Sequence, residues 1–325
     1  MAAYAGVDVG ATNLRAVVGD ADGRLLGRAG RATPRGPTGI DVTEAVLGTL
    51  RDACDAAGVA PTALRAVGIG SIGPLDLTEG AVVRPANLPG AVDRIPLSGP
   101  IEQLVDGAPV YLQNDTTAGV VGERFYADRN PDDMVYLTLS SGVGAGICVD
   151  GTVLEGWDGN AGEVGHFRVD PAGRMTCGCG LDGHWEAYCG GANIPEYLRW
   201  LAERDPALET AVSLADETLT AADVMAVGPD DPLVAHLLER LAHWNAIGVA
   251  NVVHAYAPLE IAIGGAVALE NAETIVEPIR ERVPELVMTN VPRIRLTSLG
   301  DEVVVRGALA GALTGGTGDR SRLTR

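Results

Sequence analysis

Two histidines and two cysteines lie close together in a glycine-rich stretch in the middle of the chain. The four are His166, Cys177, Cys179 and His184, and together they span 19 residues. Imidazole and thiolate groups in this number can form a closed tetrahedral zinc site. Four protein ligands leave no open position, so the pattern predicts a structural zinc rather than a catalytic one. The Cys-x-Cys spacing is less usual than Cys-x-x-Cys, and buried free thiols with a solvent-facing His184 are the alternative interpretation.

Carboxylates flank these possible ligands on both sides. Glu163 precedes His166 by three residues, and Glu186 follows His184 by two. A metal held by the four ligands would therefore bring both carboxylates into one neighbourhood.

A second polar cluster runs from Gln113 to Gly119, between an apolar segment and a predicted helix that extends to Phe125. Polar residues at the carboxyl end of a strand are typical of ligand sites in α/β sheets. Asn114 offers both a donor and an acceptor, and Asp115 could act as a general base for a hydroxyl group. A helix N-cap would use the same residue types, so both interpretations stay open.

Two glycine-containing turns could hold phosphate. The first follows Asp8, whose carboxylate could hold a hydrated Mg²⁺ while the backbone amides of Gly10, Ala11, Thr12 and Asn13 face phosphate oxygens. The second, at 140–144, joins two predicted strands in the same way, and each hairpin is followed by an Asp-Gly turn. This repetition indicates two similar α/β halves and the geometry of a nucleotide clamp. Asp8 as an ordinary turn residue, and two ordinary hairpins, are the alternatives.

The elements that would position these residues follow from hydrophobic periodicity. We predict strands over 4–8, 14–19, from 25, and over 66–72, 110–113, 134–139, 145–149, 259–263 and 294–299. Helices are predicted over 41–58 with Gly58 as C-cap, and over 191–203, 233–256, 272–288 and 303–313. Residues 73–100 are predicted to form a loop, and the tail from 315 to 325 to be frayed.

Composition excludes several classes of protein. The 325 residues carry 24 basic and 43 acidic side chains, a net charge of −19, and no lysine. Without lysine, a Walker A loop, a pyridoxal-phosphate Schiff base and a protein-kinase site are impossible. The negative charge argues against nucleic-acid and anionic-membrane partners. Without a signal peptide, a membrane-length apolar run or a disulfide framework, we expect a cytoplasmic protein.

The order of the motifs resembles that of the ROK family of sugar kinases and sugar-responsive repressors. The resemblance covers residues 4–314 and rests on Asp-Val-Gly-Ala-Thr-Asn-Leu-Arg from residue 8, Asn-Asp at 114–115, Gly-Glu-Val-Gly-His at 162–166, and Cys-x-Cys-Gly-x-x-Gly-His-x-Glu at 177–186. The last block is highly specific. The resemblance implies an α/β fold of the actin/hexokinase type, in which two ribonuclease-H-like domains close over a sugar and Mg-ATP.

The resemblance also implies roles for individual residues. Asp115 would take the proton from the sugar hydroxyl. The sugar would be bound by Asn114, Asp115, Glu163, His166 and Glu186. Mg-ATP would be bound by Asp8, Gly10, Ala11, Thr12, Asn13, Ser140, Ser141, Gly142, Gly144, Gly264 and Gly265. Zinc would be held by His166, Cys177, Cys179 and His184, so that His166 contacts both the metal and the sugar.

The sequence departs from the family pattern in two places. His184 stands where a cysteine is usual, and Ser140-Ser141-Gly142 stands where many members have Gly-Thr-Gly. Imidazole also binds zinc and hydroxyls also donate to phosphate, so we expect both sites to persist, with altered zinc affinity and a less certain nucleotide preference.

We therefore expect an ATP-dependent hexose kinase that phosphorylates the 6-hydroxyl of glucose. An N-acetylhexosamine kinase and a fructokinase are the alternatives within the family. A sugar-sensing repressor, or a sugar-binding protein without activity, is the alternative from a different functional class. The repressor is disfavoured by the net charge and by a first strand that begins at Tyr4. We expect a small domain of residues 1–116 with 303–325, a large domain of 117–302, and a homo-oligomer, dimer or tetramer.

Overall fold

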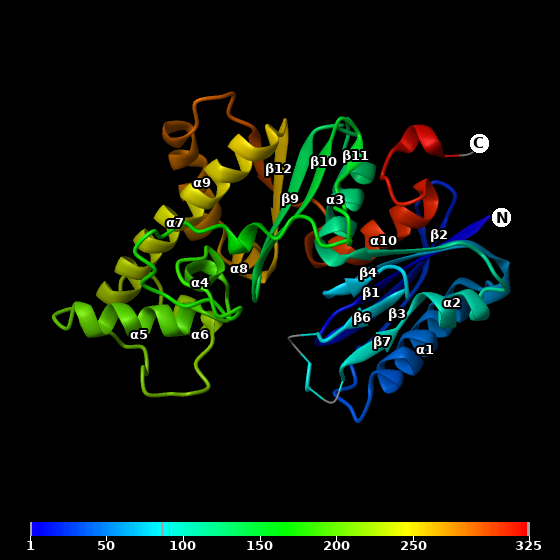
Figure 1. Ribbon diagram of the computed structural model, residues 1–325, viewed down its shortest axis with the longest axis horizontal. Helices are drawn as coiled ribbons and strands as arrows, with labels where there is room; N and C mark the ends of the chain where they lie inside the picture. The colour runs from blue at the N-terminus through cyan, green and yellow to red at the C-terminus, as the bar shows by residue number, and fades with distance from the viewer. Residues whose placement is uncertain (1, 86–87, 91, 324–325) are drawn as a thin grey trace. The chain divides into compact units, whose positions relative to one another are not determined.

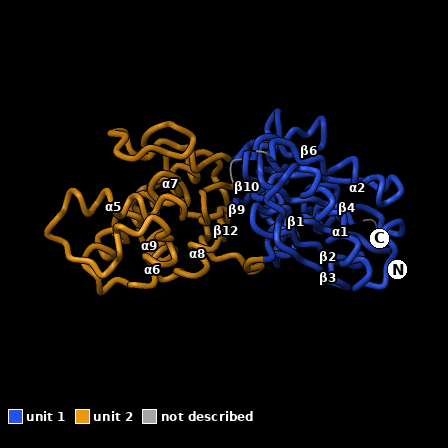
Figure 2. The backbone as a smooth tube through the Cα atoms, turned by 90° about the horizontal axis from the view of Figure 1, so that it is seen from below, with its two compact units in different colours: residues 1–136, 146–162, 302–325 blue, residues 137–145, 163–301 orange. Residues whose placement is uncertain are grey.

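The computed structural model describes residues 2–85, 88–90 and 92–323, which form two compact units (Figure 2). Unit 1 consists of residues 1–136, 146–162 and 302–325. Unit 2 consists of residues 137–145 and 163–301. The chain thus passes from unit 1 to unit 2 and back more than once.

A five-stranded sheet forms the centre of unit 1, in the order β3-β2-β1-β4-β8. Strands β1 (Ala3–Val9), β2 (Asn13–Asp20) and β3 (Leu25–Ala32) are antiparallel, whereas β4 (Leu64–Ser71) and β8 (Val110–Asn114) run parallel to β1. In this register Val9 pairs with Ser71, and Ser71 pairs with Asn114. The carboxyl ends of β1, β4 and β8 therefore meet at one edge of the sheet, where the motifs after Asp8 and Gln113 begin.

Helices cover the sheet of unit 1 (Figure 1). Helix α1 (Gly39–Ala57) contacts β2 and β3, and it ends at Gly58 in the left-handed conformation, as predicted. Helix α10 (Val303–Thr314) packs against β1 and β4 and also against α3 (Asp115–Tyr126). Glycines permit this close contact, because a Cβ at Gly68 would lie 1.9 Å from the carbonyl oxygen of Ala308.

The prediction that residues 73–100 form a loop is wrong. The segment contains a small sheet of β5 (Leu75–Asp76), β6 (Ala81–Val83) and β7 (Arg94–Pro96), followed at its end by α2 (Ser98–Leu104). These strands have two or three residues each, too few to produce a visible alternation. Leu75, Val82 and Ile95 are nevertheless buried in the main core cluster. Part of the predicted loop, residues 86, 87 and 91, lies outside the described residues.

The second five-stranded sheet has the order β11-β10-β9-β12-β13. Its strands are β9 (Met134–Leu139), β10 (Val143–Val149), β11 (Thr152–Val153), β12 (Glu260–Gly264) and β13 (Arg293–Leu296). The division between the units falls within β9 and β10. The turn between these two strands belongs to unit 2, so each unit contains one of the two predicted phosphate loops.

The rest of unit 2 is mainly helical, as predicted. Its helices are α4 (Glu186–Cys189), α5 (Ile194–Arg204), α6 (Ala221–Val227), α7 (Pro232–Tyr256), α8 (Ala266–Glu270) and α9 (Ala272–Leu286). Asp231 caps α7 by accepting hydrogen bonds from the amides of Leu233 and Val234. Single 3₁₀ turns lie at Pro61–Ala63, Val164–His166, Gly300–Glu302 and Arg320–Arg322. Across the described residues, no helix is long and apolar enough to cross a membrane.

The tail is ordered from residue 315 to residue 323, contrary to the expectation of fraying. The buried Arg124 donates hydrogen bonds to the carbonyls of Pro131, Gly151 and Thr317 and pairs with Asp132 at 2.5 Å. Asn130 donates a further bond to the carbonyl of Gly318. A buried guanidinium needs several acceptors, and the tail supplies one of them. Residues 324 and 325 lie outside the described part of the chain.

Candidate active site and metal cluster

The turn after β1 is tightly folded and leaves amides available. The amide of Gly10 donates to the carbonyl of Asn13 at 3.0 Å, and Thr33 bonds the carbonyls of Gly10 and Thr12 at 2.7 and 2.9 Å. Within the described residues, the amides of Ala11 and Thr12 have no hydrogen-bond partner. Two adjacent free amides beside a carboxylate at position 8 suit a phosphate group and its magnesium ion.

Asn114 and Asp115 lie at the same sheet edge, where β8 gives way to α3. The Asn114 side chain is the N-cap, since its Oδ1 accepts from the amide of Thr116 at 3.0 Å and from its hydroxyl at 2.8 Å. The carboxylate of Asp115, the first helical residue, also accepts from the Thr116 amide, at 2.8 Å. The capping interpretation is thus correct for Asn114. Asp115 is half-buried, so part of it is accessible to solvent.

The four predicted metal ligands of unit 2 converge. One donor atom from each of His166, Cys177, Cys179 and His184 lies within 4.8 Å of all the others. The two Nδ1 atoms are 3.3 Å apart, Cys179 Sγ is 3.3 Å from the Nδ1 of His184, and Cys177 Sγ is 3.7 Å from that of His166. A tetrahedral zinc with ordinary bond lengths separates two nitrogens by roughly 3.3 Å and a nitrogen from a sulfur by roughly 3.6 Å. This soft donor set and its spacing fit zinc.

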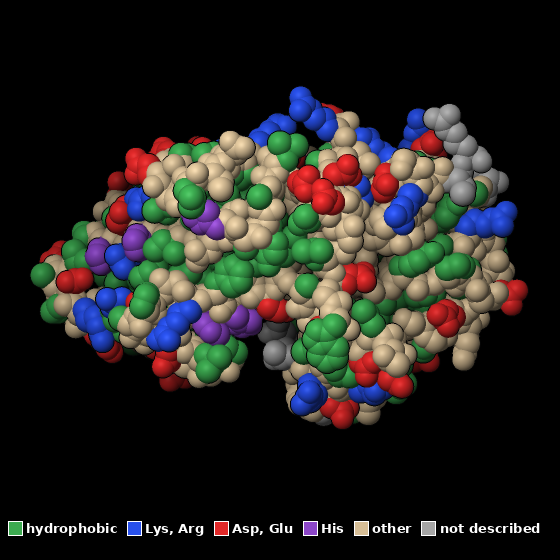
Figure 3. All heavy atoms as spheres, turned by 45° about the horizontal axis from the view of Figure 1, so that its top comes forward, with side chains coloured by type: hydrophobic (Ala, Val, Ile, Leu, Met, Phe, Trp, Pro, Cys, Tyr) green, Lys and Arg blue, Asp and Glu red, His purple; other side chains and the backbone are tan. Residues whose placement is uncertain are grey.

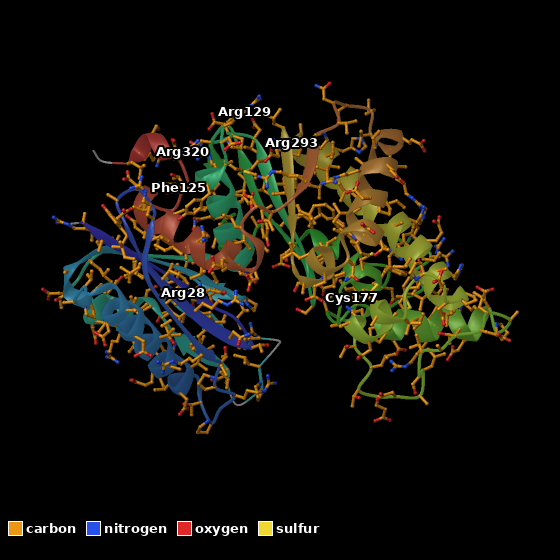
Figure 4. The ribbon with its side chains drawn as sticks, turned by 180° about the vertical axis from the view of Figure 1, so that it is seen from behind. Arg28, Phe125, Arg129, Cys177, Arg293 and Arg320 are labelled. Carbon is orange, nitrogen blue, oxygen red and sulfur yellow. The ribbon has the colours of Figure 1, made fainter. Side chains whose placement is uncertain are left out.

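Local hydrogen bonds preform the segment that carries the ligands. Two β-bridges, Arg168 with His184 and Thr176 with Asp182, fold it back on itself. The buried Asp170 accepts four hydrogen bonds, from the amides of Ala172 and Arg174, the Arg174 guanidinium and the Tyr188 hydroxyl. Cys177 lies on this segment, ahead of α4 (Figure 4).

The two candidate sugar carboxylates both contact the metal cluster. Glu163 Oε2 lies 3.6 Å from the Nε2 of His166, the ring nitrogen that faces away from the other ligands. Glu186 Oε2 accepts from the amide of Val143 at 2.9 Å, and its Oε1 lies 3.7 Å from Cys177 Sγ. Glu186 therefore bridges the cluster and the second glycine turn. His166 can bind a metal through one nitrogen and a substrate through the other.

Burial shifts the pKa values of the cluster and of a carboxylate beside it. It raises the pKa of the Cys177 thiol to about 11 and lowers the pKa of the His184 ring, which the neighbouring His166 lowers further. Desolvation, together with the Glu186 carboxylate, raises the pKa of Glu163 despite the opposing effect of His166. A bound cation would counteract the first effect, because zinc is coordinated by the thiolate form.

The second glycine turn borders a cavity of about 230 Å³ in unit 2. Ser140 and Ser141 line one side, and their carbonyls accept from the amides of Gly191 and Ala192 at 2.7 and 3.0 Å. The segment after Gly264 and Gly265 lines another side. Gly265 has a φ of 88°, and a Cβ there would lie 2.3 Å from the carbonyl oxygen of Leu139. Of the residues of unit 2 predicted to bind Mg-ATP, Ser140 and Ser141 line this cavity, whereas Gly142, Gly144, Gly264 and Gly265 are not part of its lining.

Several residues of this cavity were not found from the sequence. They are Thr220, Ala221, Ala222, Met225, Glu270 and Asn271, on α6 and around the start of α9. In unit 1, Asn160 was missed as well. Its Oδ1 accepts from the amide of Leu75 at 3.4 Å, and it lies beside Gly73 together with Asn114. None of these residues belongs to a local motif, so no sequence signal pointed to them.

The chain is acidic overall, and on the face shown in Figure 3 carboxylates and basic side chains are interspersed.

The two-unit α/β architecture, with one glycine turn in each unit, is the actin/hexokinase-like fold of sugar phosphotransferases. Over residues 4–314 the chain matches the ROK family, and it belongs to that family. It is 37% identical over 314 residues to a glucokinase of Pyrobaculum calidifontis, covering 95% of each chain. Among solved structures it is similar to a ROK hexokinase from Thermus thermophilus (32% identity, TM-score 0.80, 95% of this chain and 97% of that one). It is also similar to a ROK glucokinase from Streptomyces griseus in complex with glucose and AMPPNP (30%, 0.75, 95% and 99%).

Proposed function

We propose that this protein is a glucokinase that transfers the γ-phosphoryl group of ATP to the 6-hydroxyl of glucose. The observation that carries the proposal is the meeting of Asp115 and the turn after Asp8 at one edge of the sheet of unit 1. A base and a phosphate-binding turn at one edge are what phosphoryl transfer to an alcohol requires. The identity to proteins named glucokinase supports the choice of sugar.

In this proposal Asp115 accepts the proton of the sugar hydroxyl. The Asn114 cap fixes the first turn of α3 and so orients the neighbouring carboxylate. The amides of Ala11 and Thr12 receive phosphate oxygens, and Asp8 holds the hydrated metal ion. When bound, magnesium would neutralise the charge of the transferring phosphoryl group. The cavity beside Ser140 and Ser141 receives the nucleoside.

The sugar is neutral, so hydrogen bonds rather than charge must hold it. Glu163 and Glu186 act as acceptors for hydroxyl groups, and the Nε2 of His166 serves as a further partner. The four-ligand cluster would hold zinc in a structural role, and its ligands would then keep His166 and the neighbourhood of Glu186 in place. The two glutamates then need no reorganisation when the sugar binds.

The experiment is a coupled assay of ADP release with Mg-ATP and a sugar panel. The panel contains glucose, mannose, fructose, N-acetylglucosamine and N-acetylmannosamine, so that it also tests the N-acetylhexosamine kinase and fructokinase alternatives. Glucose should have the highest kcat/KM. Failure of every sugar in folded, zinc-loaded protein would contradict the proposal and favour a sugar-binding protein without activity.

The role of Asp115 has its own test. Asp115→Asn should lower kcat by about 10²–10⁴, as expected for loss of a general base, while the Kd for glucose measured by calorimetry stays nearly unchanged. Asp22→Asn, at an exposed turn of the same unit, is the matched control. Turnover of Asp115→Asn near the wild-type rate would refute the assignment.

We further propose a homo-oligomer, dimer or tetramer, in a reducing cytoplasm. Leu238 and Ile247 on α7 are only half-buried, which leaves apolar surface for a second copy. The free cysteines of the cluster and the use of ATP fit that compartment. Light scattering of the purified protein measures the assembly directly.

A further inference from the structure

One tryptophan of the described chain is almost completely exposed. The side chain of Trp157 is 96% exposed, whereas Trp185 and Trp244 are buried and Trp200 is half-buried. A tryptophan side chain in water forgoes one of the largest gains from burial that any residue offers. Apolar side chains exposed singly are ordinary on protein surfaces, so the position of Trp157 in the fold must decide whether this one has a role.

The loop that carries Trp157 is held in shape by its own bonds. The amide of Ala161 donates to the carbonyl of Glu155 at 3.2 Å. Asn160 bonds twice to Asp158, with its amide to the side chain at 3.2 Å and with its side chain to the carbonyl at 3.0 Å. Trp157 thus stands at the tip of a short closed loop.

The base of this loop is anchored beside Asn114. Gly159 is buried, and a Cβ there would lie 2.6 Å from the side chain of Leu77. A Cβ at Gly73 would lie 3.2 Å from Asn114 Nδ2 and 3.9 Å from Asn160 Oδ1, so the side-chain amides of Asn114 and Asn160 are neighbours. The loop also leads directly into Glu163, six residues after the tryptophan. The base of the loop thus lies beside one residue proposed to bind the sugar, and the chain that leaves the loop reaches a second one six residues later.

We infer that Trp157 is a sugar-binding residue, an aromatic platform that packs against the C–H face of the pyranose ring. This inference rests on the proposed function, because it takes a hexose as the ligand. The polar residues Asn114, Asp115 and Glu163 can satisfy the hydroxyl rim of a sugar, but none offers a surface for its apolar face. The indole of Trp157, on the loop whose base lies beside Asn114, would supply that surface, since small-molecule sites are lined mainly by apolar and aromatic side chains with a few polar groups.

Kinetics give the first test. Trp157→Ala should raise the KM for glucose about tenfold, the effect expected for loss of one aromatic contact, while kcat and the KM for ATP change less than twofold. Trp157→Phe should restore most of the affinity. Met288→Ala, which removes a 91% exposed apolar side chain from unit 2, is the matched control and should leave all constants unchanged.

Fluorescence gives a readout that does not depend on turnover. Acrylamide is the suitable quencher, because it is neutral and the net charge of −19 would repel iodide. Glucose should protect the wild-type protein from quenching. In Trp157→Phe, both the accessible component and the glucose effect should disappear, since the remaining tryptophans are at least half-buried.

The outcomes separate the two proposals. Absence of phosphorylation with every sugar of the panel would contradict the kinase proposal itself. Wild-type phosphorylation of glucose with an unchanged KM in Trp157→Ala, or without protection from acrylamide, would overturn only the inference about Trp157. If the same variant instead lowered the molecular mass measured by light scattering, the tryptophan would be assigned to a contact between copies, and the inference would also be wrong.

Discussion

Replacing Asp170 with alanine should destabilise unit 2 strongly, although the residue contacts no proposed substrate. The Asp170 side chain is 2% exposed and accepts four hydrogen bonds. In Asp170→Ala the Tyr188 hydroxyl, in a fully buried residue, loses its acceptor. The amides of Ala172 and Arg174 lose theirs as well. Because Arg174 is 47% exposed, water can replace part of its ion pair.

The size of the effect follows from this arrangement. Removing one partner of a buried, hydrogen-bonded ionic group typically costs about 3–5 kcal/mol. The exposed guanidinium places the expected value near the lower limit, about 3 kcal/mol, and most of it comes from the orphaned hydroxyl and amides. For a unit of this size, each kcal/mol lowers Tm by roughly 2–4 °C, which gives a fall of about 6–12 °C.

Calorimetry of zinc-loaded protein measures this fall. Asp216→Ala is the control, since Asp216 also accepts local hydrogen bonds from Thr218 but is exposed, and it should lower Tm by less than about 3 °C. A change in Asp170→Ala no larger than in the control would refute the argument that Asp170 organises the segment that carries the metal ligands.

The remaining predictions concern the four-residue metal cluster, the 230 Å³ cavity beside Ser140 and Ser141, and stability in acid. Purified protein should contain about one zinc per chain by plasma mass spectrometry. Cys177→Ser should lose the zinc, whereas Cys189→Ser, which removes a buried thiol outside the cluster, should retain it. Zinc retained by Cys177→Ser would contradict the ligand set. Ala222→Trp should fill much of the 230 Å³ cavity and raise the KM for ATP at least tenfold without changing the Kd for glucose, and an unchanged KM for ATP would place the nucleoside elsewhere. Burial alone would raise the pKa of Asp170, but its hydrogen bonds and the Arg174 guanidinium lower this pKa overall. An aspartate in the unfolded chain has a pKa of about 4, so the stability that the ionised Asp170 contributes is fully present above about pH 4. That stability is lost as the pH falls through the lower pKa of the folded state. The difference in Tm between the wild type and Asp170→Ala should accordingly be constant at neutral pH and shrink below about pH 4; a difference that grows with acidification would show that the sign is wrong.

The helices and long strands were predictable because their patterns are local. Apolar spacing over 41–58 and 233–256 gave α1 and α7 to within two residues at each end, and Gly58 gave the end of α1. The short strands after residue 73 were missed because two or three residues cannot show a period. The ordered tail was missed because its order depends on Arg124, almost 200 residues away in the sequence.

The same distinction applies to the candidate site. The four candidate metal ligands lie within one short segment and were found from their types and spacing, and the structure brings them together. Asn114 and Asp115 were found because they follow a strand. The walls of the 230 Å³ cavity come from the turn at Ser140 and Ser141, the α4–α5 turn, α6, and the segment from the start of α8 to Asn271, which no spacing rule connects. Trp157 was overlooked because its exposure, and not its sequence context, distinguishes it.

The metal cluster has a consequence beyond its own segment. The ligand Cys177 lies against Glu186, and Glu186 in turn holds the amide of Val143 in the second glycine turn. A Cβ at Gly142 would lie 2.5 Å from the same carboxylate, so the turn and the glutamate are closely packed. The proposed sugar acceptor and the proposed phosphate turn thus share one support. Removal of zinc by a chelator should therefore raise the KM for glucose and the KM for ATP together. A chelator-treated enzyme with a higher KM for glucose but an unchanged KM for ATP would show that Glu186 does not couple the sugar site to the phosphate turn.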